Sequence, residues 1–102
     1  MTLPDIDFAR PMPAVSQAEV RRAVVALGLP DGWTPADDVA LMEGLFMGFG
    51  LQAIGARLGK PFGETQARFL ALRRAAVGHG AFTLDAQTAL LNVAREIAGV
   101  KP

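Results

Sequence analysis

The sequence has few of the residue types that carry covalent or metal chemistry. It contains no cysteine, and His79 is its only histidine and Ser16 its only serine. The lack of cysteine excludes disulfide bonds and thiolate metal ligands. A single histidine excludes a zinc finger, and together with a single serine it argues against a Ser-His-Asp triad. We therefore predict that the chain is not an enzyme and holds no metal or cofactor.

Long apolar runs are also absent. No stretch reaches the roughly 18 uninterrupted apolar residues that a membrane-spanning helix needs. The richest run, residues 40–51, contains Glu43. The N-terminus lacks the basic region and the apolar segment of a signal peptide. These features predict a cytoplasmic protein that does not contact a membrane.

Neither sign of charge is in excess, since ten basic and ten acidic side chains give a net charge of zero at pH 7. The two signs are nevertheless separated along the chain. Residues 1–43 carry seven acidic and three basic side chains, whereas residues 44–80 carry five basic side chains and one acidic. This split favours one face that meets an anion, although the neutral total argues weakly against nucleic acid.

The 102 residues are predicted to form one domain with an arm before it. Residues 1–15 hold three prolines, which lack an amide donor and disfavour helix in the residue before them. We predict an extended arm there, whose apolar residues dock on the domain or on a partner. Residues 16–102 are predicted to form a single helical domain.

Start and stop signals along residues 16–102 predict an all-α fold of about five helices. Ser16 is suited to cap the first helix, and Glu19 to complete a capping box. Thr34, followed by Pro35 and Asp37, is the strongest start signal in the chain. Glycines after each apolar stretch mark the helix ends. The predicted helices are 16–27, 35–47, 51–58, 63–77 and 84–98.

Apolar side chains at helical spacing define the expected core. The central three helices are predicted to bury Trp33, Leu41, Leu45, Ile54, Leu58, Phe69 and Leu72. On helix 63–77 the buried stripe is predicted to be Phe62, Thr65, Phe69, Leu72 and Ala76. The last helix has a stripe of its own, made of Leu84, Leu91, Ala94, Ile97 and Ala98 and widened by Leu90 and Val93. Two roles fit that stripe: packing with the first helix as a lid over the core, or homodimerisation.

A motif set spans residues 33–74 and consists of Trp33, Thr34, Leu41, Gly48, Ile54, Leu58, Gly59, Lys60, Arg68, Phe69 and Leu72. It resembles the Myb/SANT-like helix-turn-helix, and most closely the N-terminal module of the GcrA family of bacterial cell-cycle regulators. The stretch from Ile54 to Gly59 is similar to the Ile-Ala-x-x-Leu-Gly stretch of that family. The chain departs from the family at residues 61–63, where Pro-Phe-Gly replaces Arg or Thr and polar side chains.

This resemblance implies a sequence-specific DNA-binding transcription regulator of bacterial type, associated with the nucleoid, whose recognition helix at about 63–77 enters the major groove of double-stranded DNA. The residue types agree, because alanines let a backbone approach the groove walls while arginines bond phosphates or guanine edges. The predicted DNA-binding residues are Arg57, Lys60, Glu64, Gln66, Ala67, Arg68, Ala71, Arg73 and Arg74.

Two interpretations of Arg68 are open. It lies nearest the bases together with Gln66, or it pairs with an acid of helix 35–47, for which Asp37, Asp38 and Glu43 are the candidates. The first interpretation makes Arg68 part of a DNA-reading face. The second makes it a structural residue.

Other functions are also compatible with the sequence. A SANT-like domain can bind protein, for example RNA polymerase or another regulator, and the neutral total charge favours this alternative. A phage-type DNA-packaging or regulatory subunit is a third. An enzyme is not expected, because no nucleophile, metal set or acid-base pair is assembled.

Overall fold

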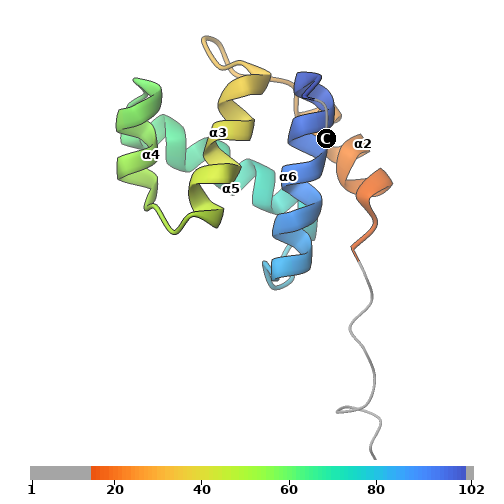
Figure 1. The fold of residues 1–102 in the computed structure, drawn as a ribbon. Coiled ribbons are helices and arrows are strands. Elements are labelled where there is room, and N and C mark those ends of the chain that lie inside the picture. Colours follow the sequence, from red (N-terminus) through yellow and green to blue (C-terminus); the bar gives the residue numbers. More distant parts are fainter. Residues whose placement is uncertain (1–14, 101–102) are drawn as a thin grey trace, which may run out of the picture.

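A computed structural model describes residues 15–100, and within that range the chain is all-helical (Figure 1). The helices are α2 (Gln17–Leu27), α3 (Pro35–Phe46), α4 (Leu51–Leu58), α5 (Phe62–Val77) and α6 (Leu84–Ala98). The predicted all-α class is therefore confirmed, and the predicted helix bounds agree to about one residue at each end. Apart from Val15, the predicted arm lies outside the described residues. None of the described helices is long and apolar enough to cross a membrane.

Side-chain caps set where the helices begin. At α3 the Thr34 hydroxyl accepts a hydrogen bond from the Asp37 amide at 3.2 Å, and the Asp37 carboxylate accepts one from the Thr34 amide at 2.9 Å. This is a complete capping box. At α2 the Ser16 hydroxyl accepts from the Glu19 amide at 3.3 Å, but the reciprocal bond predicted from Glu19 is not formed.

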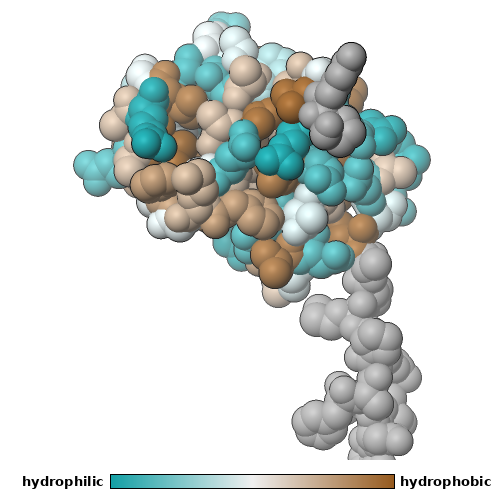
Figure 2. Space-filling model, viewed as in Figure 1, coloured by the Kyte–Doolittle hydropathy of each residue, from teal (hydrophilic) through white to brown (hydrophobic). Residues whose placement is uncertain are grey.

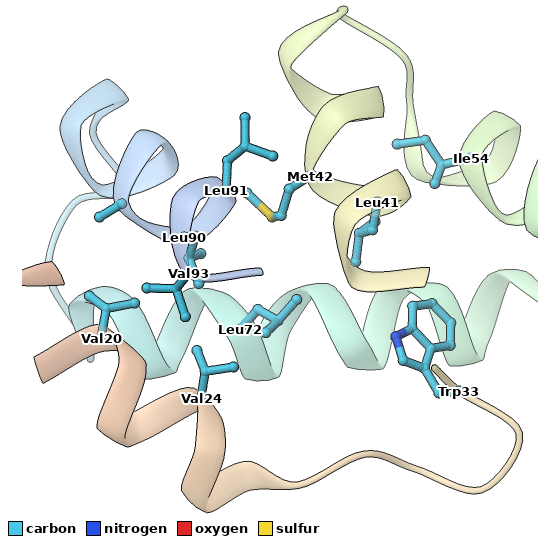
Figure 3. Packing of buried hydrophobic residues seen from close by; sticks show 11 residues of the cluster. Val20, Val24, Trp33, Leu41, Met42, Ile54, Leu72, Leu90, Leu91 and Val93 are labelled. Carbon is cyan, nitrogen blue, oxygen red and sulfur yellow. The ribbon is translucent and has the colours of Figure 1, made fainter. Parts of the chain in front are cut away.

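Helix α6 lies within the core of the domain and not over it as a lid. It packs mainly against α3 and also against α2 and α5. Figure 3 shows Leu91 beside Met42 of α3, while Leu90 and Val93 point toward α2 and α5. The predicted packing with the first helix, α2, is thus confirmed, but the predicted lid is wrong because α3 is the main partner. The buried side chains are Ala86, Ala89, Leu90, Leu91, Val93 and Ala94.

The predicted stripe on α6 is wrong at its two ends. Leu84 is 68% exposed and Ile97 is 39% exposed. Leu84 is the first residue of α6 and Ile97 lies in its last turn, whereas the buried side chains come from residues 86–94. The middle of the stripe offered for homodimerisation is therefore buried within the fold of the chain itself.

The core predicted for residues 33–77 is confirmed, although some of its members are only partly buried. Trp33, Leu41, Ile54 and Leu72 are buried. Three other predicted members are partly buried and pack against them, namely Leu45, Leu58 and Phe69. These residues join α3, α4 and α5 into one packed unit that continues into α6.

Helix α4 approaches both of its neighbours at glycines. A Cβ atom at Gly44 of α3 would lie 2.8 Å from Cγ1 of Ile54, and one at Gly55 of α4 would lie 2.7 Å from Oγ1 of Thr65 in α5. Real Cβ atoms do not come that close, so any side chain would push the helices apart. The chain then turns into α5 through Gly59, whose φ of +69° suits glycine. The α4–α5 junction is consequently tight.

Candidate binding face on helix α5

Arg68 is held inside the protein by an ion pair. Its Nε and Nη2 atoms donate to the Asp38 carboxylate at 2.8 Å and 2.7 Å, and Nη1 donates to the Gly28 carbonyl at 2.9 Å. The Trp33 indole donates to the same carboxylate at 2.7 Å. The Arg68 and Asp38 side chains are only 3% and 6% exposed.

This geometry decides between the two interpretations of Arg68. The predicted ion pair with an acid of helix 35–47 is confirmed, and the partner is Asp38 of α3. The prediction that Arg68 lies nearest the bases is wrong, because its three guanidinium nitrogens are buried and already hydrogen-bonded. A bidentate pair of this kind, with the Trp33 indole as an extra donor, is a strong link between α3 and α5.

Lys60 also has partners inside the molecule. Its ammonium group donates to the Gly32 carbonyl, lies 3.9 Å from the Asp37 carboxylate and lies 5.7 Å from the centre of the Trp33 ring. Lys60 thereby ties the turn after α4 to the loop before α3. A phosphate contact would have to compete with these three partners.

Arg57 lies apart from the arginines of α5. Its guanidinium stacks over the Phe49 ring at 4.8 Å from the ring centre, beside the connection between α3 and α4. Arg73 and Arg74 stand near the other end of α5, which rises about 18 Å between residues 62 and 74. The predicted cations therefore do not form a single face, although Arg73 and Arg74 lie together near the C-terminal end of α5.

Burial of Arg68 also fixes how α5 is rotated. The helix buries Thr65, Arg68 and Leu72. Phe62, which the sequence placed in the buried stripe, is 49% exposed, so that prediction is wrong. An arginine in the core turns the buried side away from Phe62. Of the other predicted site residues on α5, Ala71 is partly buried and the exposed ones are Glu64, Gln66, Ala67, Arg73 and Arg74.

Leu70 is a surface residue that the sequence interpretation missed. It is 51% exposed and lies three and four residues from Ala67 and Arg74, in the middle of the outward side of α5. The ion-pair interpretation of Arg68 could have predicted this exposure. If Arg68 and Leu72 lie inside, helix geometry places Leu70 on the outside. The outward side of α5 is thus less cationic and more apolar than predicted.

A groove runs between α2 and α5 along this outward side. Its central hollow has a volume of about 620 Å³, and the only charged side chain lining it is Arg74. We call it the α2–α5 groove. Its lining residues are Ala23, Ala26 and Leu27 of α2 and Ala67, Leu70, Ala71, Arg74 and Ala75 of α5.

Two smaller hollows extend the groove in both directions. The first shares Ala67 and Ala71 with it and reaches Asp31 and Glu64, near the N-terminal end of α5. The second shares Leu70 and Arg74 with it and is lined by Arg73, Gly78, His79 and Gly80, at the C-terminal end. The groove and its extensions therefore follow most of the length of α5.

The two ends of the groove carry opposite charge. Asp31 and Glu64 lie at one end, and Arg73 and Arg74 at the other. None of these four forms a salt bridge with another residue in the range 15–100. The groove is thus apolar along its middle, acidic at one end and basic at the other.

A second apolar patch lies at the end of α3. Phe46 is 40% exposed and Met47 is 71% exposed, and they precede the turn into α4. Figure 2 shows brown and tan surface near this connection, interrupted by teal polar groups. The associated hollow, about 250 Å³, is smaller than the α2–α5 groove and is bordered by the charged side chains of Glu43 and Arg57.

Comparison of the chain with protein families, with curated proteins and with solved structures gives no match. The resemblance to the Myb/SANT-like and GcrA-type modules therefore stays a prediction from the sequence.

Proposed function

We propose that this chain is a protein-binding module and that the α2–α5 groove holds its partner. The observation that carries the proposal is an open apolar groove lined by alanines and by two exposed leucines, Leu27 at 44% and Leu70 at 51%. Exposed apolar surface around a concave site is typical of protein-interaction surfaces. The centres of protein interfaces contain few charged residues, but arginine is enriched in them. Arg74 lines this groove.

The charge around α5 favours a protein over a duplex. Recognition helices contact bases with their N-terminal residues. The N-terminal end of α5 instead has Glu64 and the nearby Asp31, and Lys60 is engaged with Gly32 and Asp37. DNA phosphates approaching this end would meet two carboxylates, which repel them.

Double-stranded DNA is the second candidate partner, and one observation favours it. Arg73 and Arg74 are exposed and have no salt-bridge partner within the described residues, and Gln66 is exposed on the same helix. These side chains suit phosphate contacts in a transcription regulator or a phage-type DNA-packaging subunit. RNA polymerase or another regulator would be a partner of the kind that the protein-binding function requires.

Site-specific crosslinking tests the protein-binding function. A photo-crosslinking amino acid is placed at Leu70 or, as a matched control, at Leu84, which is 68% exposed on α6. In cells that naturally express the chain, we expect one defined protein to be captured from position 70 and not from position 84. The purified candidate should then bind the wild-type chain and lose roughly tenfold or more in affinity when Leu70→Glu is introduced.

Binding of a mixed-sequence DNA duplex separates the two candidates. We expect no measurable binding in fluorescence anisotropy at about 50 mM salt, where phosphate contacts are strong. Duplex binding that falls steeply with salt and disappears in Arg73→Ala/Arg74→Ala would support the DNA candidate in place of the protein one.

A further inference from the structure

The shape and charge of the α2–α5 groove specify the kind of partner that fits it. Building on the protein-binding function proposed above, we infer that the groove binds an amphipathic α-helix of a partner protein. This helix runs antiparallel to α5, with acidic residues in its first turn against Arg73 and Arg74 and basic residues in its last turn against Asp31 and Glu64.

The walls of the groove select a helix over an extended peptide. Both walls are α-helices, whose backbone amides and carbonyls are bonded within each helix. An extended peptide gains affinity by pairing its backbone with a free sheet edge, and the groove has none. Its own amides would be buried without partners, which is costly. A helix satisfies its backbone internally and needs only side-chain contacts.

The floor of the groove suits the ridges of a packed helix. Ala23 and Ala26 of α2 face Ala67 and Ala71 of α5 across the hollow. Small residues on both sides leave room for larger apolar side chains of a third helix, in the way that ridges enter grooves. From residue 64 to residue 74 α5 rises about 15 Å, which corresponds to about three turns of a bound helix.

The direction of the partner helix follows from the charges at the two ends. Acidic side chains are favourable near a helix N-terminus and basic ones near a C-terminus. Arg73 and Arg74 attract acidic side chains, so the N-terminus of the partner belongs at the C-terminal end of α5. Asp31 and Glu64 attract the basic last turn. This orientation also places the two helix dipoles antiparallel.

Two synthetic peptides of about 15 residues test the inference, a length that spans the groove with its extensions. Both have leucines at spacings of three and four residues, a staple that fixes the helix, and blocked ends. The charged peptide has glutamates in its first turn and lysines in its last turn, and the neutral peptide has glutamines at all of those positions. Affinity for the full chain is measured by fluorescence anisotropy at about 50 mM salt.

We expect the charged peptide to bind about fivefold tighter than the neutral one, as for a few exposed ion pairs. Arg73→Gln/Arg74→Gln should reduce that preference to the part contributed by Asp31 and Glu64, and Ala67→Leu, which occupies the groove, should weaken both peptides. A nitroxide on the N-terminus of the charged peptide should broaden the amide signals of Arg74 and Gly78 and leave those of Gly63 and Glu64 sharp.

Each contrary result overturns a defined part of the inference. Equal binding of both peptides, mapped to the groove, would remove the charge assignment while the protein-binding function stands. Broadening at Glu64 would reverse the orientation. If neither peptide binds, a helical occupant is refuted. If a DNA duplex shifts the amide signals of α5 instead, the proposed protein-binding function is refuted as well. Light scattering could also show that the chain is a dimer and that Ala67→Leu dissociates it. The occupant of the groove would then be a second copy of this chain.

Discussion

The junctions of helix α5 with α4 and with α2 are built in opposite ways. Toward α4 the junction is closed, because Gly55 lets Thr65 approach so closely that a Cβ atom would lie 2.7 Å from its hydroxyl. Toward α2 the junction is open over its outer half, where Ala67 and Ala71 leave a hollow of about 620 Å³. A single helix is thus tightly packed on one side and incompletely packed on the other.

The difference shows which surfaces serve the fold and which are free for another role. Interiors are close-packed, and side chains around a void lose dispersion contacts. A leucine in place of Ala67 would occupy the hollow with no buried partner to displace. The closed junction therefore serves the fold, whereas the open junction leaves apolar surface for the binding proposed above.

The largest expected effect comes from the buried ion pair on the inward side of α5. In the wild-type chain the Asp38 carboxylate accepts hydrogen bonds from Arg68 and from the Trp33 indole. Arg68→Ala removes the arginine and leaves a buried carboxylate bonded to the indole. We expect a loss of about 3–5 kcal/mol in the free energy of unfolding, measured by urea denaturation. The matched control on the outward side, Arg74→Ala, should change it by less than about 0.5 kcal/mol. Equal losses for the two arginines would contradict the division of α5 into two sides.

A methyl group at the closed junction should have the next largest effect. Gly55→Ala places a Cβ atom against Thr65 and 3.0 Å from the Lys60 carbonyl, so α4 and α5 must separate. We expect a loss of about 1–3 kcal/mol in the free energy of unfolding. Gly63→Ala is the control, since nothing lies within 4 Å of its Cβ position. Alanine favours helix over glycine by up to about 1 kcal/mol, so the control should be neutral or stabilising.

The open junction should tolerate a larger side chain without loss of stability. Ala67→Leu adds more volume than Gly55→Ala, yet we expect it to change the free energy of unfolding by less than about 0.5 kcal/mol because position 67 is exposed. The same variant should weaken binding of the charged helical peptide by roughly tenfold or more. Met47→Ala, on the other exposed patch, should leave peptide binding unchanged. A large loss of stability in Ala67→Leu would mean that the groove is part of the core.

A salt bridge on the exposed side of α2 should contribute much less than the buried ion pair. Arg21 and Glu96 form a salt bridge of 2.7 Å between side chains that are 51% and 40% exposed. Exposed pairs contribute little, so Arg21→Ala should lower the free energy of unfolding by no more than about 1 kcal/mol, and raising the salt should shrink the difference. A loss comparable to that of Arg68→Ala would show that α2 is held by this pair.

Local signals in the sequence were sufficient for the helices and most of the core. The capping box of Thr34 and Asp37 and the apolar spacing around Leu41, Ile54 and Leu72 depend on neighbours within a few turns. The pairing of Arg68 with Asp38 spans 30 residues, and three acids competed for it in sequence. The choice of partner is made by packing of α3 on α5.

The surface was harder to predict because it depends on that choice. Once Arg68 is inside, Leu70 turns outward, and the outward side of α5 becomes apolar along its middle, where the sequence indicated a cationic face. The groove requires α2 as its second wall, and α2 lies about 40 residues before the α5 residues it faces. The spacing of apolar residues within one helix cannot predict a hollow that lies between two helices.

The most direct test of the central claim is a nuclear magnetic resonance titration of the isotope-labelled chain with the charged helical peptide and, separately, with a DNA duplex at about 150 mM salt. We expect the peptide to shift the amide signals of the groove, and the duplex to shift none of them. The signals concerned are those of Ala23, Ala26, Ala67, Leu70, Ala71 and Arg74. Groove signals that stay in place with the peptide, while the duplex shifts those of Gln66, Arg73 and Arg74, would contradict the claim.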